Sequence, residues 1–267
     1  MYRSGKSGKN NSIILRMNNQ LTDNDFWKHF WESKKNLIFK VKPDYTFSTI
    51  IGNLIKKRNI KSVIELGGFP GYYSVFSKKY FGLDATLFDY YIHPKIIQKL
   101  LDYNDMHLSD IHVIEADLFT YQPKQKYDMV CSFGLIEHFS DTKEIIVKHL
   151  SFLSDGGTLF ITLPNFRGIN GWVQKTFDQY NYDKHFIKCM DLQYLSATAK
   201  ELGLKNVEVF YYGGFSTWLE NKEEKSWFTK MMVKSIWLIG KIRSKIRKSE
   251  SKLMSPYIVM IGEKISY

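Results

Sequence analysis

A short segment, Glu65-Leu66-Gly67-Gly68-Phe69-Pro70-Gly71, follows an apolar run and combines a carboxylate with three glycines. Glycine lets the backbone turn sharply and lets a ligand come close. A helix that starts after such a segment offers its N-terminus to a negative group. A second acid, Asp89, ends the next apolar run, where it could accept hydrogen bonds from ribose hydroxyls. A plain turn and a capping aspartate would also explain these residues, but their combination favours ribose binding.

The glycine spacing argues against a dinucleotide site. A dinucleotide fingerprint needs glycines in the order G-x-G-x-x-G. Counted from Gly67, the second and third glycine positions hold Phe69 and Tyr72. Recognition of a pyrophosphate is therefore disfavoured.

Alternating apolar runs and amphipathic stretches surround these residues, as expected for a sheet built from βαβ units. The runs at 62–66, 83–88, 111–116, 127–133, 158–163, 207–212 and 257–261 predict strands. Apolar spacing predicts helices at 43–57, 70–81, 93–101, 142–153 and 191–202. We therefore predict an α/β fold, a three-layer sandwich with a Rossmann-like, seven-stranded, mostly parallel sheet whose last strand is antiparallel.

Ligands of such sheets bind at the carboxyl ends of the strands, and five motifs fall there in order. They are Glu65 to Gly71, Asp89, Ala116-Asp117-Leu118, Ser132 to His138, and the Gly156-Gly157 turn into Phe160 to Pro164. With these motifs the sequence resembles the class I S-adenosylmethionine-dependent methyltransferases, in particular the small-molecule enzymes of the ubiquinone-biosynthesis type. The resemblance covers roughly residues 61–163.

The resemblance implies S-adenosylmethionine as cofactor and a role for each motif. Its methionine part would lie on Glu65, Gly67, Gly68 and Gly71 and against Ser132 and Phe133, its ribose on Asp89, and its adenine on Asp117 and Leu118. Phe69 departs from the family pattern, acid-x-Gly-x-Gly-x-Gly, because it replaces the middle glycine. Gly68 would supply the flexibility instead.

Methyl transfer from a sulfonium depends mainly on alignment, but an oxygen acceptor usually needs its proton removed, most often by histidine. By the resemblance, His138 lies near the acceptor and is the candidate base. A local cap would explain it equally well. His185 is an alternative base within segment 165–190, an expected acceptor-binding insertion. Glu137 and His138 alone are a thin ligand set for a hard cation, so we predict no metal.

Length and composition favour one domain in a reducing compartment. The chain has 267 residues and two cysteines, too few for a disulfide framework. We expect a flexible tail at 1–19 without a secretion signal, a single methyltransferase domain at 20–267, and a cytoplasmic location. An aromatic cluster before the core (Phe26, Trp27, Phe30, Trp31) predicts either a lid or a helix packed on the core edge.

A second insertion, 217–252, contains a basic amphipathic helix. Eight of the formal +11 charges lie between Lys225 and Lys248, without an acid. The predicted apolar stripe is Phe228, Met232, Ile236, Ile239, Ile242 and Ile246, with lysines opposite. The helix could lie on an anionic membrane or pack on its own domain; nucleic acid is less favoured.

The acceptor would be a small or lipid-linked molecule, methylated at oxygen. RNA methylation and a non-catalytic binding module are the alternatives.

Overall fold

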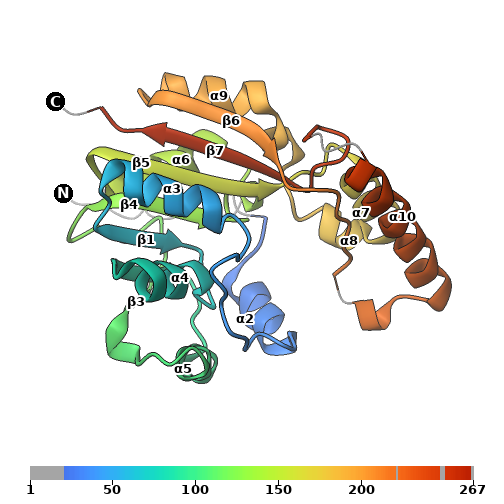
Figure 1. Ribbon diagram of the computed structural model, residues 1–267, viewed down its shortest axis with the longest axis horizontal. Helices are drawn as coiled ribbons and strands as arrows, with labels where there is room; N and C mark the ends of the chain where they lie inside the picture. The colour runs from blue at the N-terminus through green and yellow to red at the C-terminus, as the bar shows by residue number, and fades with distance from the viewer. Residues whose placement is uncertain (1–20, 221, 247–249, 266–267) are drawn as a thin grey trace, which may run out of the picture.

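The computed structural model describes residues 21–220, 222–246 and 250–265, which are built around one seven-stranded sheet (Figure 1). Its strands are β1 (Ser62–Leu66), β2 (Asp84–Asp89), β3 (His112–Glu115), β4 (Tyr127–Phe133), β5 (Leu153–Pro164), β6 (Lys205–Tyr212) and β7 (Tyr257–Glu263). Their order is β3-β2-β1-β4-β5-β7-β6, and β7 runs antiparallel to both of its neighbours. The predicted fold class is confirmed. The tail predicted at 1–19 lies outside the described residues.

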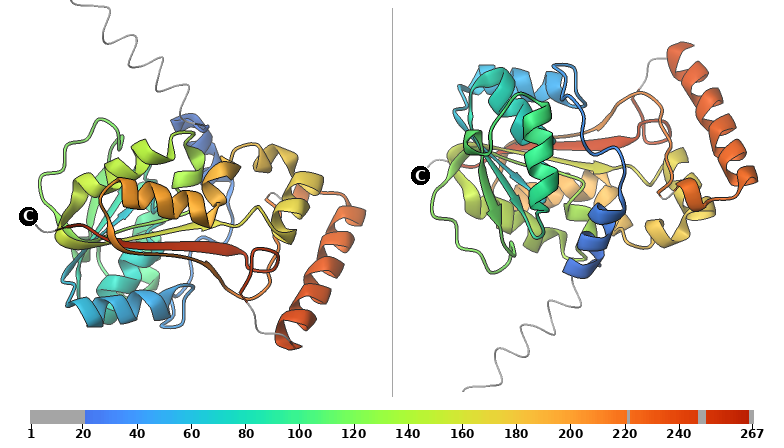
Figure 2. Two further views of the ribbon diagram at one scale, coloured as in Figure 1. Left: turned by 90° about the horizontal axis from the view of Figure 1, so that it is seen from above. Right: turned by 90° about the horizontal axis from the view of Figure 1, so that it is seen from below.

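Helices cover both faces of this sheet (Figure 2). The α-helices are α2 (Asn24–Ser33), α3 (Ser48–Arg58), α4 (Tyr72–Phe81), α5 (Pro94–Tyr103), α6 (Thr142–Phe152), α7 (Ile169–Phe177), α8 (Gln179–Tyr182), α9 (Leu192–Glu201) and α10 (Trp227–Ile246). Short 3₁₀ turns are η1 (Leu108–Asp110), η2 (Ile136–His138), η3 (Ile187–Met190) and η4 (Lys222–Glu224).

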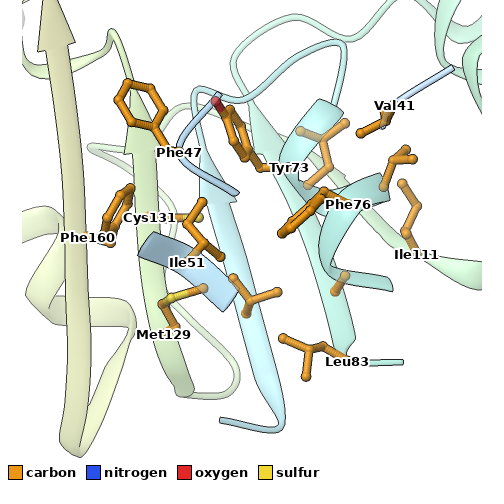
Figure 3. Close-up of a cluster of buried hydrophobic side chains, with 14 of the residues drawn as sticks. Val41, Phe47, Ile51, Tyr73, Phe76, Leu83, Ile111, Met129, Cys131 and Phe160 are labelled. Carbon is orange, nitrogen blue, oxygen red and sulfur yellow. The ribbon is translucent and has the colours of Figure 1, made fainter. Parts of the chain in front are cut away.

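The sheet separates two apolar cores, because successive side chains of a strand point to opposite faces. Along β1, Val63 joins the core under α3, α4 and α5, and Ile64 joins the core under α6 and α9. Figure 3 shows part of the first core, where Ile51 of α3 lies beside Met129 and Cys131 of β4, and Phe76 of α4 lies farther from β4. Both cores keep the sheet rigid behind the strand ends that carry the predicted motifs.

Several predicted boundaries were wrong. The helix predicted from Pro43 begins at Ser48, after Phe47 with φ of 66°. The helix predicted from Pro70 begins at Tyr72, because Gly71 with φ of 98° precedes it. The fifth strand begins at Leu153 rather than Thr158, so the Gly156-Gly157 turn lies inside β5.

The two segments predicted as insertions lie beyond the carboxyl ends of the parallel strands, where α7, α8 and α10 form the outer end of the molecule (Figure 1). Helix α10 is present as predicted, and only part of the predicted apolar stripe, at Ile236, packs against the rest of the molecule. Its buried residues are Val233 and Gly240, and most of the stripe is exposed. Within the described part of the chain, no helix is long and apolar enough to span a membrane.

Candidate active site

A cavity of about 380 Å³ lies at the carboxyl end of the sheet. Its walls come from α2, the loop after β1, the end of β4, η2, the segment after β5 and the loop after β6. Aromatic side chains supply most of them: Phe26, Trp27, Phe30, Trp31, Tyr45, Phe47, Phe69, Tyr72, Tyr73, Phe133, Phe166, Trp218 and Tyr257. An apolar cavity with a few polar groups is typical of a small-molecule site.

The loop after β1 forms one wall of this cavity. Two of its positions must be glycine, because neighbouring side chains leave no room for a Cβ atom. At Gly67, with φ of +60°, an added Cβ would lie 2.6 Å from Cδ1 of Leu135. At Gly68 an added Cβ would lie 2.2 Å from Cγ of Glu65. The Glu65 carboxylate accepts hydrogen bonds from the backbone N–H and the hydroxyl of Ser74, each over 2.7 Å. Burial raises the pKa of Glu65 to about 7, so this group titrates near neutral pH.

Asp89 ends β2 and holds the same loop. Its Oδ2 accepts from the backbone N–H of Phe69 over 2.9 Å, and its Oδ1 accepts from that of Tyr91 over 3.2 Å. Burial raises the pKa of Asp89 to about 6. The ring of Phe69 packs edge-on against Trp31. The residue that replaces the family's middle glycine is thus accommodated by helix α2, and its backbone N–H fixes Asp89.

A second, smaller cavity of about 60 Å³ brings together four of the predicted cofactor residues: Gly67, Asp89, Asp117 and Leu118. Asp117 is half-buried, and its Oδ1 accepts from the backbone N–H of Phe119 over 2.8 Å. The two cavities share Gly67 and Gly134, so they adjoin. The residues predicted to bind the nucleoside line one cavity, and Glu65, Gly67, Gly68, Phe133 and His138 line the other.

Two predicted cofactor residues line neither cavity. Ser132 is fully buried, and its hydroxyl lies 2.9 Å from Nε2 of His149 in α6. Because side chains alternate along β4, Phe133 faces the cavity and Ser132 faces the opposite core. Gly71 precedes α4, where an added Cβ would meet Leu87 of β2. Gly71 turns the chain into the helix, and the roles predicted for Gly71 and Ser132 at the methionine part of the cofactor stay predictions.

Glu137, His138 and His185 form a cluster in the main cavity. A carboxylate oxygen and one ring nitrogen from each histidine lie within 4.8 Å of one another. Nδ1 of His138 lies 3.0 Å from the carbonyl oxygen of Lys184, and Nδ1 of His185 lies 2.7 Å from that of Asn181. Each Nδ1 therefore carries the proton, and each Nε2 can accept one. The predicted absence of a metal stays a prediction.

Burial sets the charge of this cluster. It lowers the pKa of His138 to about 3 and that of His185 to about 4, so both imidazoles are neutral at pH 7. It raises the pKa of Glu137 to about 8, and Oε2 of that carboxyl has no hydrogen-bond partner among the described residues. At neutral pH the cluster thus holds two neutral imidazoles and a mostly protonated carboxyl.

Residues 42–209, well over half of the chain, match the model of a family described as "Methyltransferase domain". The chain belongs to this family. The prediction of a class I methyltransferase, and hence of an enzyme, is confirmed. A search of curated protein sequences found no match.

Solved structures similar to this methyltransferase share the fold at low sequence identity. One is an S-adenosylmethionine-dependent methyltransferase from Archaeoglobus fulgidus, with a TM-score of 0.51 and 15% identity over 82% of this chain and 95% of that one. A second, from Haemonchus contortus, is phosphoethanolamine N-methyltransferase 2 bound to S-adenosylmethionine, with a TM-score of 0.53 and 16% identity over 86% and 61%. A third, an O-methyltransferase family protein from Burkholderia thailandensis, has a TM-score of 0.51 and 14% identity over 82% and 57%. The predicted cofactor agrees with these findings.

Helix α2 covers both cavities of the methyltransferase. Trp27 and Trp31 line each of them, and none of the side chains of α2 is fully buried. The ring of Trp27 packs edge-on against His138 at 5.0 Å between centroids, and the backbone N–H of Leu21 donates to the carbonyl oxygen of His138. Lys34, at the end of α2, pairs with Glu220 of the loop after β6. Trp31 also packs against the first core, so the aromatic cluster lines both cavities and packs on the core edge, and its role as a lid stays a prediction.

Proposed function

We propose that this methyltransferase moves the methyl group of S-adenosylmethionine to an oxygen atom of a small aromatic or otherwise apolar acceptor. The cofactor would occupy both cavities, with its ribose on Asp89, its adenine between Asp117 and Leu118, and its methionine part along Gly67 and Gly68. The acceptor would occupy the rest of the main cavity. The Glu137-His138 pair fits the small-molecule enzymes of the ubiquinone-biosynthesis type, and this subtype is part of the proposal.

The observation that carries the proposal is the orientation of His138. Its Nδ1–H donates to the carbonyl oxygen of Lys184, which leaves Nε2 as the proton acceptor on a wall of the cavity. When bound, S-adenosylmethionine would supply an electrophilic methyl group and keep the electrons of the broken C–S bond on its sulfur. Nε2 of His138 would take the hydroxyl proton of the acceptor and then pass it to water. The low pKa of His138 keeps the imidazole unprotonated at neutral pH, and it also makes Nε2 a weaker base than that of an ordinary histidine.

The cavity wall supports an acceptor with an aromatic or apolar body. Rings surround the space next to His138, including Phe26, Trp27 and Phe166. They exclude water and favour a flat, apolar molecule. Aromatic faces also attract the positive sulfonium of the cofactor. A hydroxylated aromatic ring would pack against the aromatic wall and place its hydroxyl group next to His138.

Two experiments test the proposal in sequence. Calorimetric titration with S-adenosylmethionine, and with its demethylated product, should give micromolar binding that Asp89→Ala weakens. Protein with cofactor labelled in its methyl group is then offered a panel of phenols, catechols and matched anilines, and products are identified by mass spectrometry. We expect the label on oxygen. The absence of binding by folded protein would reject the cofactor site, and label on the anilines alone would reject oxygen transfer.

RNA methylation is the second candidate, because five basic side chains lie on α10. It predicts RNA affinity that falls steeply with salt and methyl transfer to RNA that is lost when α10 lysines are reversed to glutamate. The narrow, ring-lined cavity fits a small molecule better, since only an extruded nucleobase could enter it.

A further inference from the structure

Helix α10 has two apolar faces, and only one of them is packed. Val233 and Ile236 pack against Val173 of α7 and Leu219, while Gly240 lies so close to Phe215 that an added Cβ would be 2.0 Å from its ring. The absence of a side chain at Gly240 lets the helix sit directly on that ring. This face anchors α10 to the molecule, so the helix and its outward direction are fixed by the fold.

The opposite face of α10 carries a band of exposed apolar side chains. Its members and their exposed fractions are Trp227 75%, Phe228 59%, Met231 40%, Leu238 52%, Ile239 67%, Ile242 52% and Ile246 82%. At about 100° per residue, these positions fall within an arc of roughly 120° that is centred away from Val233 and Gly240. A contiguous apolar band along a helix of 20 residues is more than scattered surface hydrophobics.

Basic side chains border the band. Lys230, Lys234, Lys241 and Lys245 form a row along one edge at helical spacing, and Arg243 lies beyond the other edge. The helix contains no Asp or Glu. Lys241 also lies over the ring of Trp237, 5.6 Å from its centroid. The face therefore combines apolar side chains at its centre with positive charge at its margins.

We infer that this outer face of α10 docks the protein on the surface of an anionic lipid bilayer. The apolar band would enter the boundary between headgroups and acyl chains, and the lysine row would lie among the anionic headgroups. Charge complementarity selects this occupant. A second copy of the chain would place lysines against lysines, and a nucleic acid would leave the apolar band in water. The inference concerns binding alone and does not depend on the proposed methyl transfer.

The location of α10 gives the docking a defined orientation. The helix lies at the outer end of the molecule in all three ribbon views, away from α3, α4 and α5 (Figures 1 and 2). Leu219, which it contacts, belongs to the same loop as the cavity residues Trp218 and Glu220. A bilayer bound to α10 would thus lie on the side of the molecule where the main cavity is.

The test uses the full chain and sedimentation with vesicles of neutral phosphatidylcholine, with or without a third of phosphatidylserine, at low and high salt. We expect binding to the anionic vesicles at low salt, weaker binding at high salt, and little binding to neutral vesicles. Vesicles with brominated acyl chains should quench part of the tryptophan fluorescence. Trp227→Phe should remove much of that quenching, because Trp227 lies in the band.

Two variants separate the apolar and charged contributions. Leu238→Ser combined with Ile239→Ser and Ile242→Ser should lower the partition coefficient at least about tenfold. Lys234→Glu combined with Lys245→Glu should lower it at least about 20-fold. The matched control, Lys95→Glu with Lys99→Glu on exposed positions of α5, should leave binding almost unchanged, although it alters the net charge equally.

Three results would overturn the inference. One is the absence of binding to anionic vesicles at low salt by protein with a native thermal transition. Another is vesicle binding that the triple serine variant retains, because the apolar band would then not be in contact with the bilayer. The third is concentration-dependent dimerisation in analytical ultracentrifugation, lost in the triple serine variant and unaccompanied by vesicle binding, because the face would then be an interface between copies.

Discussion

The backbone N–H of Phe69 donates to Oδ2 of Asp89 over 2.9 Å, and this bond joins the loop after β1 to the end of β2. One carboxylate thereby holds the loop and lines the smaller cavity. A ribose would be a further partner of a group that is already oriented by the protein. The bond also explains how a phenylalanine is tolerated at the family's middle glycine, since the contact uses only its backbone.

Asp89→Asn should separate these two roles. The amide oxygen can still accept from the backbone N–H of Phe69, but the amide nitrogen cannot accept from that of Tyr91, so the thermal transition should fall modestly. The lost charge should weaken S-adenosylmethionine binding by about 10- to 100-fold, measured by calorimetry. Asp84→Asn, at the exposed start of the same strand, is the control and should bind as the original protein does. Equal affinity in the two variants would place the ribose elsewhere.

His138→Gln should lower the rate of methyl transfer by about 10²- to 10⁴-fold, because the substitution removes the proposed base. The affinity for S-adenosylmethionine should stay within about twofold. His185→Gln should have the smaller effect on rate. A chelator in the assay should leave the rate of the original protein unchanged, and loss of activity that an added divalent cation restores would instead assign the Glu137-His138-His185 cluster to a metal.

Gly68→Ala should destabilise the fold by about 1–3 kcal/mol, because its Cβ would overlap the Glu65 side chain. Cofactor affinity should fall with it, as Glu65 and Gly68 line the same cavity. Gly214→Ala is the matched control, because a Cβ there meets no atom within 4 Å. Its change in the free energy of unfolding, measured in urea, should stay within about 0.5 kcal/mol. A similar loss in both variants would contradict the packing argument.

Glu137→Gln should change how stability depends on pH. In the folded protein this carboxyl ionises only near pH 8, while in the unfolded chain it ionises near its ordinary value. The folded state therefore holds more protons between these values, and this group makes the free energy of unfolding fall as pH rises from about 5 to about 8. The variant lacks this contribution. The difference between its melting temperature and that of the original protein should therefore shift in favour of the variant by several degrees from about pH 5 to about pH 9. Glu208→Gln, at an exposed position of β6, should show no such gain. Parallel melting curves for Glu137→Gln and the original protein would contradict the prediction.

Strand positions were readable because each strand is a short apolar run, and the motif order placed Asp89 and Asp117 at neighbouring strand ends. The contact between His138 and His185 was not readable. The two residues are distant in the chain, and the folding of segment 165–190 over η2 brings them together, with Phe186 N–H donating to the carbonyl oxygen of Glu137. Ser132 was predictable in principle. Once Phe133 is assigned to the cavity, alternation along β4 sends its neighbour to the other face.

The packed face of α10 could not be read from periodicity. Apolar residues occupy more than half of the circumference of this helix, so the pattern alone does not say which arc is buried. The decisive contact is Gly240 against Phe215. Glycine has no side chain, so it is not counted when an apolar stripe is identified from the sequence. The sequence therefore predicted the helix and its lysines but left open whether the apolar stripe packs on the domain or faces outward.

Helix α2 also bears on kinetics. With Trp27 and Trp31 in place, the smaller cavity of about 60 Å³ is far smaller than the usual site of an organic ligand. Cofactor association should therefore be limited by how often α2 swings away, and its observed rate should level off as cofactor concentration rises. The same movement would release the demethylated product, so α2 would set the rates of both cofactor binding and product release.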